Sequence, residues 1–233
     1  MPSLERDGDV FVLNLAHADG VNPENRFHPD WIEQVHRLLD EAEASEGPAA
    51  LVTVGAGKFY SNGLDVEYLF SHADTIPEYL DLAHTVYTRL LRFPMATVGA
   101  VQGHAFGAGA MLALCHDTSV MRADRGYFCL PEVNLNMPFT EGMSTLLAER
   151  LPAQTVLDAM TTGRRYSGAD AMAAGIVSAV ASEEELLSTA VALAAQRTST
   201  RGPNLTSIKN SIHVRTLAAL SIPTAESSFS LGQ

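Results

Sequence analysis

The chain has 233 residues, of which 46% are hydrophobic, and it carries a net charge of −12. A field of that sign repels DNA and RNA at long range, so nucleic acid is excluded as the expected partner, although a small anionic ligand can still bind through a few local donors. No apolar run approaches the roughly 18 residues of a membrane span, and the polar start MPSLERDGDV disfavours a secretory signal, so we expect no membrane association and a cytoplasmic location.

Short apolar runs alternate with helical periodicity through the first half of the chain. The runs predict strands at residues 10–15, 49–54, 95–101, 118–121 and 127–130, and the periodicity predicts helices at residues 29–43, at residues 77–91 and up to residue 114. Because these strands are apolar on both faces and alternate with helices, the expected fold class is α/β, with a parallel sheet covered by helices.

From about residue 140 the pattern becomes mostly helical. The periodicity predicts helices at residues 141–149, 155–160, 183–197 and 206–220, and one short apolar run at residues 176–180 interrupts them. We therefore expect one core domain over residues 1–200, followed without a linker by a short C-terminal helical region at residues 201–233.

Two glycine-rich loops, Gly55–Lys58 and Gly107–Gly109, each follow an apolar strand. The first is not a phosphate-binding loop, because Phe59 stands where that loop needs Ser or Thr. The second lacks the third glycine of a dinucleotide-binding loop, since that position is Leu112. Each loop alone is also consistent with a tight turn. Two such loops on neighbouring strand ends, however, can present two convergent backbone N–H groups to the oxygen of a thioester enolate.

Four segments, in order along the chain, resemble the enoyl-CoA hydratase/isomerase (crotonase) family. They are Gly57–Asp65 (GKFYSNGLD), Ala100–Gly109 (AVQGHAFGAG) with Asp117 eight residues on, Leu130–Val133 (LPEV), and Thr162–Ala169 with Gly175–Val177. The similarity extends over roughly residues 8–200. It implies a crotonase-like spiral of ββα units and an acyl-CoA thioester as substrate. It also implies no cofactor beyond the coenzyme A of that substrate, and a homotrimer or a dimer of trimers.

The resemblance also assigns roles to residues by position. It places two oxyanion-stabilising N–H donors at Leu64 and Ala108 and the acid/base carboxylate at Glu132, and it makes Gly107 and Met111 part of the substrate site. The segment that it expects to line coenzyme A comprises Ser61, Asn62, Gly63, Leu64 and Asp65.

Hydratases of this family use two glutamates, whereas this chain has Met111 at the first position and Glu132 at the second. Adding water needs two acid/base groups, but a single carboxylate suits a 1,3-proton shift, which takes a proton from C2 of a 3-enoyl thioester and returns it at C4. The resemblance therefore implies an isomerase. We expect Met111, Phe128 and Phe139 to shield Glu132 from water and so to raise its pKa.

Several alternatives stay open at this point. Glu141, nine residues after Glu132, is a competing acid. Hydration, thioester hydrolysis, dehalogenation and decarboxylation all use the same oxyanion loops, and a non-catalytic subunit that only binds coenzyme A would retain them as well. Each of these alternatives predicts a different product, or none, from an acyl-CoA thioester.

Other polar residues in the motifs have structural interpretations. His104 and His116 are expected to be hydrogen-bonded core histidines, and Asp65 and Asp117 to cap helices or anchor turns. Ser61 has no evident His and Asp partners, and nothing in the sequence has metal-ligand spacing, so we expect neither a serine nucleophile nor a metal. Cys115 and Cys129 lie in hydrophobic stretches and are expected to be reduced core thiols.

Overall fold

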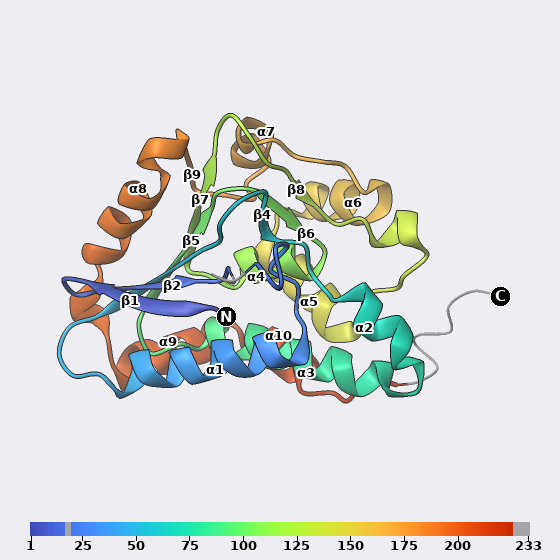
Figure 1. Cartoon of the computed structure of the whole chain (residues 1–233), viewed down its shortest axis with the longest axis horizontal. Helices are drawn as coiled ribbons and strands as arrows, with labels where there is room; N and C mark the ends of the chain where they lie inside the picture. Colours follow the sequence, from blue (N-terminus) through green and yellow to red (C-terminus); the bar gives the residue numbers. More distant parts are fainter. Residues whose placement is uncertain (17–19, 226–233) are drawn as a thin grey trace.

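The computed structural model describes residues 1–16 and 20–225, which form two β-sheets surrounded by helices (Figure 1). The larger sheet has the strand order β1-β2-β3-β5-β7-β9. Its strands are β1 (Ser3–Asp7), β2 (Val10–Asn14), β3 (Ala50–Val54), β5 (Ala96–Val101), β7 (Thr118–Arg122) and β9 (Ala179–Ala181). Strand β1 is antiparallel to β2, and the other neighbouring strands are parallel, which confirms the predicted parallel sheet.

The helices of the described residues follow the predicted pattern over most of the chain. They are α1 (Pro29–Ala44), α2 (Val66–Ser71), α3 (Ile76–Leu91), α4 (Ala108–Leu114), α5 (Glu141–Arg150), α6 (Ala153–Thr162), α7 (Gly168–Ala173), α8 (Glu183–Ala195), α9 (Pro203–Ile212) and α10 (Val214–Leu220), with short 3-10 helices η1 (Ala73–Thr75), η2 (Glu132–Leu135) and η3 (Thr198–Thr200). Within residues 1–16 and 20–225, none of these helices has the length and apolar character needed to cross a lipid bilayer.

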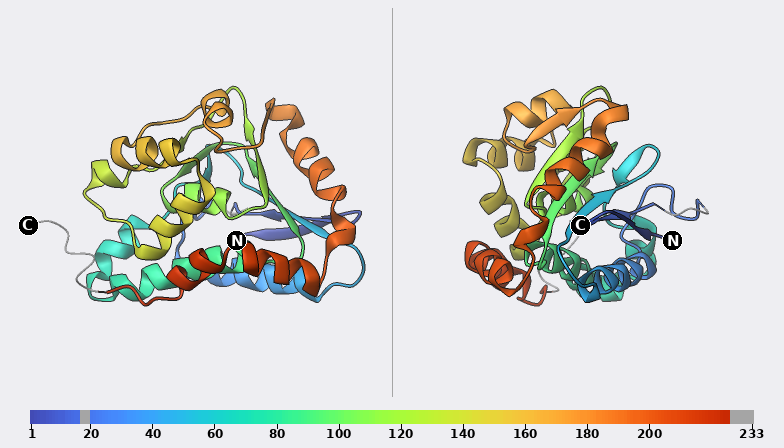
Figure 2. Two further views of the ribbon diagram at one scale, coloured as in Figure 1. Left: turned by 180° about the vertical axis from the view of Figure 1, so that it is seen from behind. Right: turned by 90° about the vertical axis from the view of Figure 1, so that its left-hand side faces the viewer.

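Helices cover both faces of the larger sheet, as its apolar strands require. On one face, Val52, Val98 and Val120 belong to a cluster with the buried side of α8. On the other face, Leu13 and Leu51 belong to a larger cluster with the buried sides of α1, α3 and α4. Figure 1 shows α8 beside the strands and α1 and α3 below them, and Figure 2 shows the same layers from behind and from the side.

A smaller parallel sheet has the strand order β4-β6-β8. Its strands are β4 (Phe59–Ser61), β6 (His104–Phe106) and β8 (Phe128–Cys129). Each follows a strand of the larger sheet after a short turn, so that β3 leads to β4, β5 to β6 and β7 to β8, and each pair is followed by a helix. The chain therefore repeats a ββα unit, which confirms the predicted spiral.

Glycines allow the turns between the two sheets to pack backbone against backbone. A Cβ on Gly103 would overlap the carbonyl group of Lys58, and a Cβ on Gly126 would lie 2.7 Å from the backbone of Gly103. No side chain fits at these distances. Successive turns can therefore stack closely, which brings β4, β6 and β8 into one sheet.

The C-terminal helical region differs from the prediction in one respect. The single helix predicted at residues 206–220 is wrong, because the chain leaves the helical conformation at His213 (φ −99°, ψ 18°) and two helices result. The break lets α10 lie against α3 and α5 while α9 holds Lys209 against the sheet, where its Nζ lies 2.8 Å from Oδ1 of Asp117. The domain boundary at residue 200 stays a prediction.

Candidate active site

An apolar pocket of about 260 Å³ lies at the edge of the smaller sheet where its strands end. Asn62 and Leu64 follow β4, Gly107 and Ala108 follow β6, and Glu132 follows β8. These loops converge because parallel strands end at the same edge of a sheet. The described residues that line the pocket are Asn62, Leu64, Val66, Leu80, Phe106, Gly107, Ala108, Met111, Pro131, Glu132, Leu135, Met137, Pro138 and Met143. Within this set, Glu132 alone has an ionisable side chain.

Two backbone N–H groups, those of Leu64 and Ala108, come close together at this edge. Gly63, directly before Leu64, has φ +85°, and a Cβ on it would lie 2.9 Å from the nitrogen of Ala108. Neither N–H donates a hydrogen bond to another residue within the described ranges. Contact between the loops thus places two unused donors next to one another, an arrangement that can stabilise an oxygen as it acquires negative charge.

Gly107 lies between the Ala108 N–H and the carboxyl group of Glu132. Its backbone angles, φ +52° and ψ −120°, favour glycine. A Cβ at this position would lie 3.1 Å from Oε1 of Glu132. The carboxyl group therefore packs against the same turn that carries the Ala108 N–H, and a small acyl group in the pocket can meet both.

Glu132 is the first residue of η2, directly after Pro131. Its Oε2 is buried and has no hydrogen-bond partner among the described residues. Burial raises the pKa of the carboxyl from its ordinary 4.5 to about 7, and a hydrogen bond from its own backbone N–H opposes this only in part. A carboxyl with this pKa is present in both protonation states near neutral pH, which suits a group that takes up a proton and returns it.

The pocket wall beside Glu132 contains one of the three side chains that were expected to shield it. Met111 lines the pocket and is only 1% exposed. Phe128 and Phe139 do not line it, whereas Met137 and Met143 do. The pKa shift therefore has the expected direction, and three methionine side chains contribute to the apolar wall of the pocket.

In the segment predicted to line coenzyme A, some residues line the pocket and others hold the loop in place. Asn62 and Leu64 line the pocket. Ser61 is fully buried, and its hydroxyl donates a hydrogen bond to the carbonyl oxygen of Asn25 (2.6 Å), so it supports the loop from behind. Asp65 is the N-cap of α2 and accepts hydrogen bonds from two N–H groups of its first turn, which confirms the predicted cap.

The competing acid and one of the histidines lie outside this pocket. Glu141 is the exposed first residue of α5 and lines a separate small pocket with residues 222–225. His116 is buried between Oγ1 of Thr53 (2.8 Å) and the carbonyl oxygen of Leu112 (3.0 Å), which confirms a hydrogen-bonded core histidine. Burial lowers the pKa of His116 to about 4, so its ring is neutral at physiological pH.

The remaining candidates have structural positions. His104 is half-buried and stacks on Tyr127 with 5.6 Å between ring centroids, but its buried Nδ1 has no hydrogen-bond partner among the described residues, so the predicted hydrogen-bonded role is wrong for this histidine. Asp117 accepts a hydrogen bond from a backbone N–H of β5 (2.9 Å), and Cys115 and Cys129 are buried free thiols, as predicted. The described part of the chain contains no cluster of three or more His, Cys, Asp or Glu side chains that could hold a metal ion.

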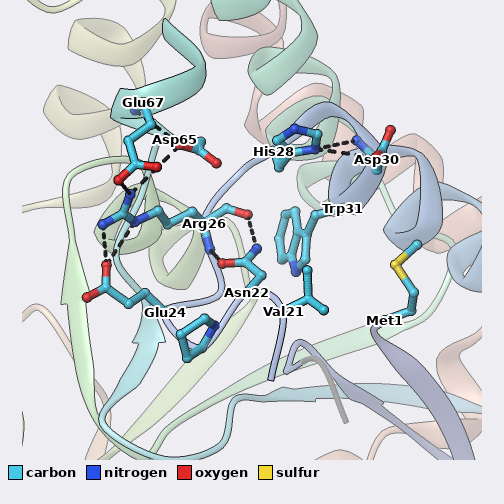
Figure 3. Close-up of a pocket in the computed structure, with 11 residues that line it drawn as sticks. Met1, Val21, Asn22, Glu24, Arg26, His28, Asp30, Trp31, Asp65 and Glu67 are labelled. Atoms are coloured by element: carbon cyan, nitrogen blue, oxygen red, sulfur yellow. Dashed lines mark hydrogen bonds and ion pairs between the residues drawn. The ribbon is translucent and has the colours of Figure 1, made fainter. Parts of the chain in front are cut away.

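A second pocket, of about 500 Å³, opens beside Arg26 (Figure 3). Sequence patterns did not predict it; the only signal is a polar run, NPENR, between a strand and a helix. Figure 3 shows the guanidinium of Arg26 among Glu24 (2.7 Å), Asp65 (3.8 Å) and Glu67 (4.0 Å). Asn62 of the first pocket donates a hydrogen bond to the same Glu24 carboxylate (2.8 Å), so the two pockets share a wall.

Known proteins resemble this chain over most of its length. The family model for enoyl-CoA hydratase/isomerase matches residues 13–223, a range that contains every residue lining the Glu132 pocket. Enoyl-CoA delta isomerase 3 of Arabidopsis thaliana is 35% identical over 187 residues, which cover 78% of this chain and 77% of that protein. Carnitinyl-CoA dehydratase of Salmonella paratyphi A is 31% identical, with 83% and 72% covered. The crystal structure of a probable enoyl-CoA hydratase from Mycobacterium tuberculosis H37Rv superposes with a TM-score of 0.85 at 25% identity, with 94% and 91% covered.

Proposed function

The chain belongs to the enoyl-CoA hydratase/isomerase family, and from that premise we propose that it is an enoyl-CoA isomerase, which moves a double bond from C3 to C2 of an acyl-CoA thioester. The observation that carries the proposal is the chemistry of the pocket wall. Glu132 is the one ionisable side chain among the described lining residues, and the position of a second acid is taken by Met111. One carboxyl group is enough for a proton shift, whereas hydration needs a second group to activate water.

The reaction proceeds through an enolate. Glu132, as the carboxylate, takes a proton from C2 of the 3-enoyl thioester, and the electrons of the C2–H bond form the enolate. Its oxygen accepts hydrogen bonds from the N–H groups of Leu64 and Ala108, which stabilise the negative charge. The protonated Glu132 then returns the proton to C4 while the double bond forms between C2 and C3. Atoms and charge balance without water or a cofactor.

The surroundings of Glu132 support this assignment. Because burial holds its pKa at about 7, the carboxylate is basic enough to take up a proton and the carboxyl acidic enough to return it. Met111 is buried beside it and can neither accept a proton nor hold a water molecule firmly. The apolar wall therefore favours a proton shift carried out by one carboxyl group over the addition of water.

We place the coenzyme A part of the substrate at the open side of the pocket. Val66 and Leu135 are 38% and 55% exposed and mark this opening. Asn62 lies on the wall shared with the Arg26 pocket, so the segment that ends at Asp65 borders both pockets. This position supports a role for the segment in contacting the substrate beyond its thioester.

The family resemblance also supports assembly as a homotrimer or a dimer of trimers. Size-exclusion chromatography with light scattering tests this part of the proposal. We expect a mass of about three or six times the 24.9 kDa of one chain, and a monomer would contradict it.

A panel of acyl-CoA thioesters tests the reaction. Incubation with a 3-enoyl thioester should increase the ultraviolet absorbance, because the product is conjugated. Loss of absorbance from a 2-enoyl thioester at a comparable rate would instead indicate hydration, and release of free coenzyme A thiol would indicate hydrolysis. Saturable binding without turnover of any thioester in the panel would leave only a non-catalytic binding subunit.

A further inference from the structure

We propose that the closed end of the Glu132 pocket limits the acyl chain to about eight carbons, and that the side chains of Leu80, Met111 and Met143 set this limit. The inference rests on the proposed function for the position of the thioester. It adds the chain-length class of the substrate and the residues that determine it.

The pocket has an open end and a closed end. Val66 and Leu135 are exposed at the open end, whereas Leu80, Met111 and Met143 are at most 3% exposed. The three buried residues come from α3, α4 and α5, and α4 contacts both of the other helices. All three belong to the main hydrophobic cluster, so protein and not solvent lies behind them. A chain that enters beside Glu132 must therefore end against this floor.

Because the pocket is open at one end, its volume sets an upper limit on the length of the chain that it encloses. A methylene group is similar in size to a water molecule, which occupies about 30 Å³ in the liquid, so a pocket of about 260 Å³ holds roughly nine non-hydrogen atoms. The thioester carbon and oxygen account for two of these atoms, and the others extend the chain to about C8. The pocket therefore fits short and medium acyl chains, and longer ones would have to displace the floor.

The floor is held in place by contacts on its far side. Oγ1 of Thr140 accepts the Met143 N–H (3.1 Å) as the cap of α5, and it also lies 2.9 Å from Nε2 of His84 on α3. Gly142 packs so tightly on α10 that a Cβ would lie 2.7 Å from Cδ2 of Leu220. The start of α5 is thus fixed by α3 and α10. Met143 can change its rotamer, but its backbone cannot retreat to lengthen the pocket.

Binding of saturated acyl-CoA thioesters, measured by calorimetry over chains of about four to sixteen carbons, tests the inference without turnover. In the wild type we expect the affinity to rise about fourfold for each methylene buried, up to about eight carbons, and then to stop rising. Met143→Ala removes three side-chain atoms, so its affinity should continue to rise to about eleven carbons. Met143→Phe should move the break to shorter chains, and Leu80→Ala should move it to longer ones.

Met121→Ala is the matched control. Met121 is a fully buried methionine of β7 that does not line the pocket, so its loss weakens the core by a similar amount and should leave the break at about eight carbons. If Met143→Ala fails to fold, Leu80→Ala and Met143→Phe decide the question. Affinity that rises through sixteen carbons in the wild type, or a break that none of the three floor variants moves, would overturn the inference.

The two proposals fail in different ways. Suppose that no isomerisation is found but the floor variants still move the chain length at which affinity stops rising. This result would contradict the proposed reaction and support the chain-length limit. Isomerisation of long acyl chains as readily as short ones would support the proposed reaction and contradict the chain-length limit.

Discussion

Oε2 of Glu132 is buried and has no hydrogen-bond partner among the described residues, so in the proposed reaction no other group competes for the proton that it carries. Glu132→Gln keeps the size of the side chain and removes the proton carrier. We expect turnover to fall by about 100-fold or more while acyl-CoA affinity stays nearly unchanged. Steady-state kinetics and calorimetry measure the two effects. Glu141→Gln is the control, and a greater loss of activity in that variant would assign the reaction to Glu141.

The raised pKa of Glu132 predicts how activity depends on pH. Abstraction of the C2 proton needs the carboxylate, and the fraction in this form increases as the pH rises through about 7. The kcat/KM for a 3-enoyl thioester should therefore increase with pH and level off about one unit above this pKa. A profile that is already flat from about pH 5.5 would mean that the carboxyl titrates near its ordinary value of 4.5.

In the proposed function, Met111 is the residue that decides between isomerisation and hydration. The wild type should convert 3-enoyl to 2-enoyl thioesters with at most trace hydration, and Met111→Glu should gain measurable hydration because it supplies a second acid. The gain is limited because a new buried carboxylate lowers the stability of the protein unless it is hydrogen-bonded. The measurement is the amount of 3-hydroxyacyl product formed from a 2-enoyl thioester. Met111→Gln, polar but not acidic, should gain nothing; hydration by the wild type at the rate of isomerisation would refute the assignment.

At the scale of elements, the start of α4 carries half of the expected oxyanion site. Ala108 is the first residue of this helix, a position where proline is tolerated, so Ala108→Pro should keep the helix and lose the N–H. We expect kcat to fall by a factor that corresponds to about 3 kcal/mol. Ala108→Gly keeps the N–H and should retain most of the activity. Circular dichroism checks that both variants fold, and a proline variant with near-normal turnover would exclude Ala108 as a donor.

The sequence predicted elements where a long or strongly apolar pattern marks them, which includes the two-residue strand β8 inside the apolar run at residues 127–130. The long helices α1 and α3 and the buried strands of the larger sheet were predicted to within a few residues, because hydrophobic periodicity is averaged over many positions. Strands β4 and β6 have three residues each and were not predicted, because each lies beside a glycine-rich loop and has no apolar run of its own. Strand β1 was missed because most of its side chains are exposed at the edge of the sheet and it has no apolar run.

Residues of the candidate site were predictable only where a single sequence motif contains both the residue and the turn that positions it. Leu64, Ala108 and Glu132 follow short strands in recognisable segments, so their positions could be predicted by resemblance. Leu80 and Met143 come from helices whose periodicity shows which face is buried but not which neighbour it meets. Their role in the pocket depends on how α3 and α5 pack on α4, and this packing is a property of the tertiary structure.

At the scale of the whole molecule, Lys209 attaches the C-terminal helices to the core. It is buried, its Nζ donates a hydrogen bond to the carbonyl oxygen of Met95 (2.8 Å), and it forms an ion pair with Asp117. Lys209→Ala leaves the Asp117 carboxylate without its partner, so we expect a loss of about 3–5 kcal/mol in the free energy of unfolding. Chemical denaturation measures it. Lys58→Ala, at an exposed lysine, should change stability by less than about 0.5 kcal/mol, and equal effects of the two substitutions would contradict an anchoring role.

The proposed use of main-chain N–H groups at Leu64 and Ala108 has a consequence for how this molecule can diversify. A donor that belongs to the backbone survives almost any substitution of its own side chain, so only the path of the two loops is constrained, through Gly63 and Gly107. The side chain of Leu64 lines the pocket, so under the proposed function it can vary with the acyl group while its N–H stays in place. A mutant library that randomises position 64 together with the pocket floor should therefore yield altered selectivity far more often than inactive enzymes. Because the oxyanion donors belong to the backbone and the pocket wall to side chains, substitutions can change the substrate selectivity and leave the donors in place.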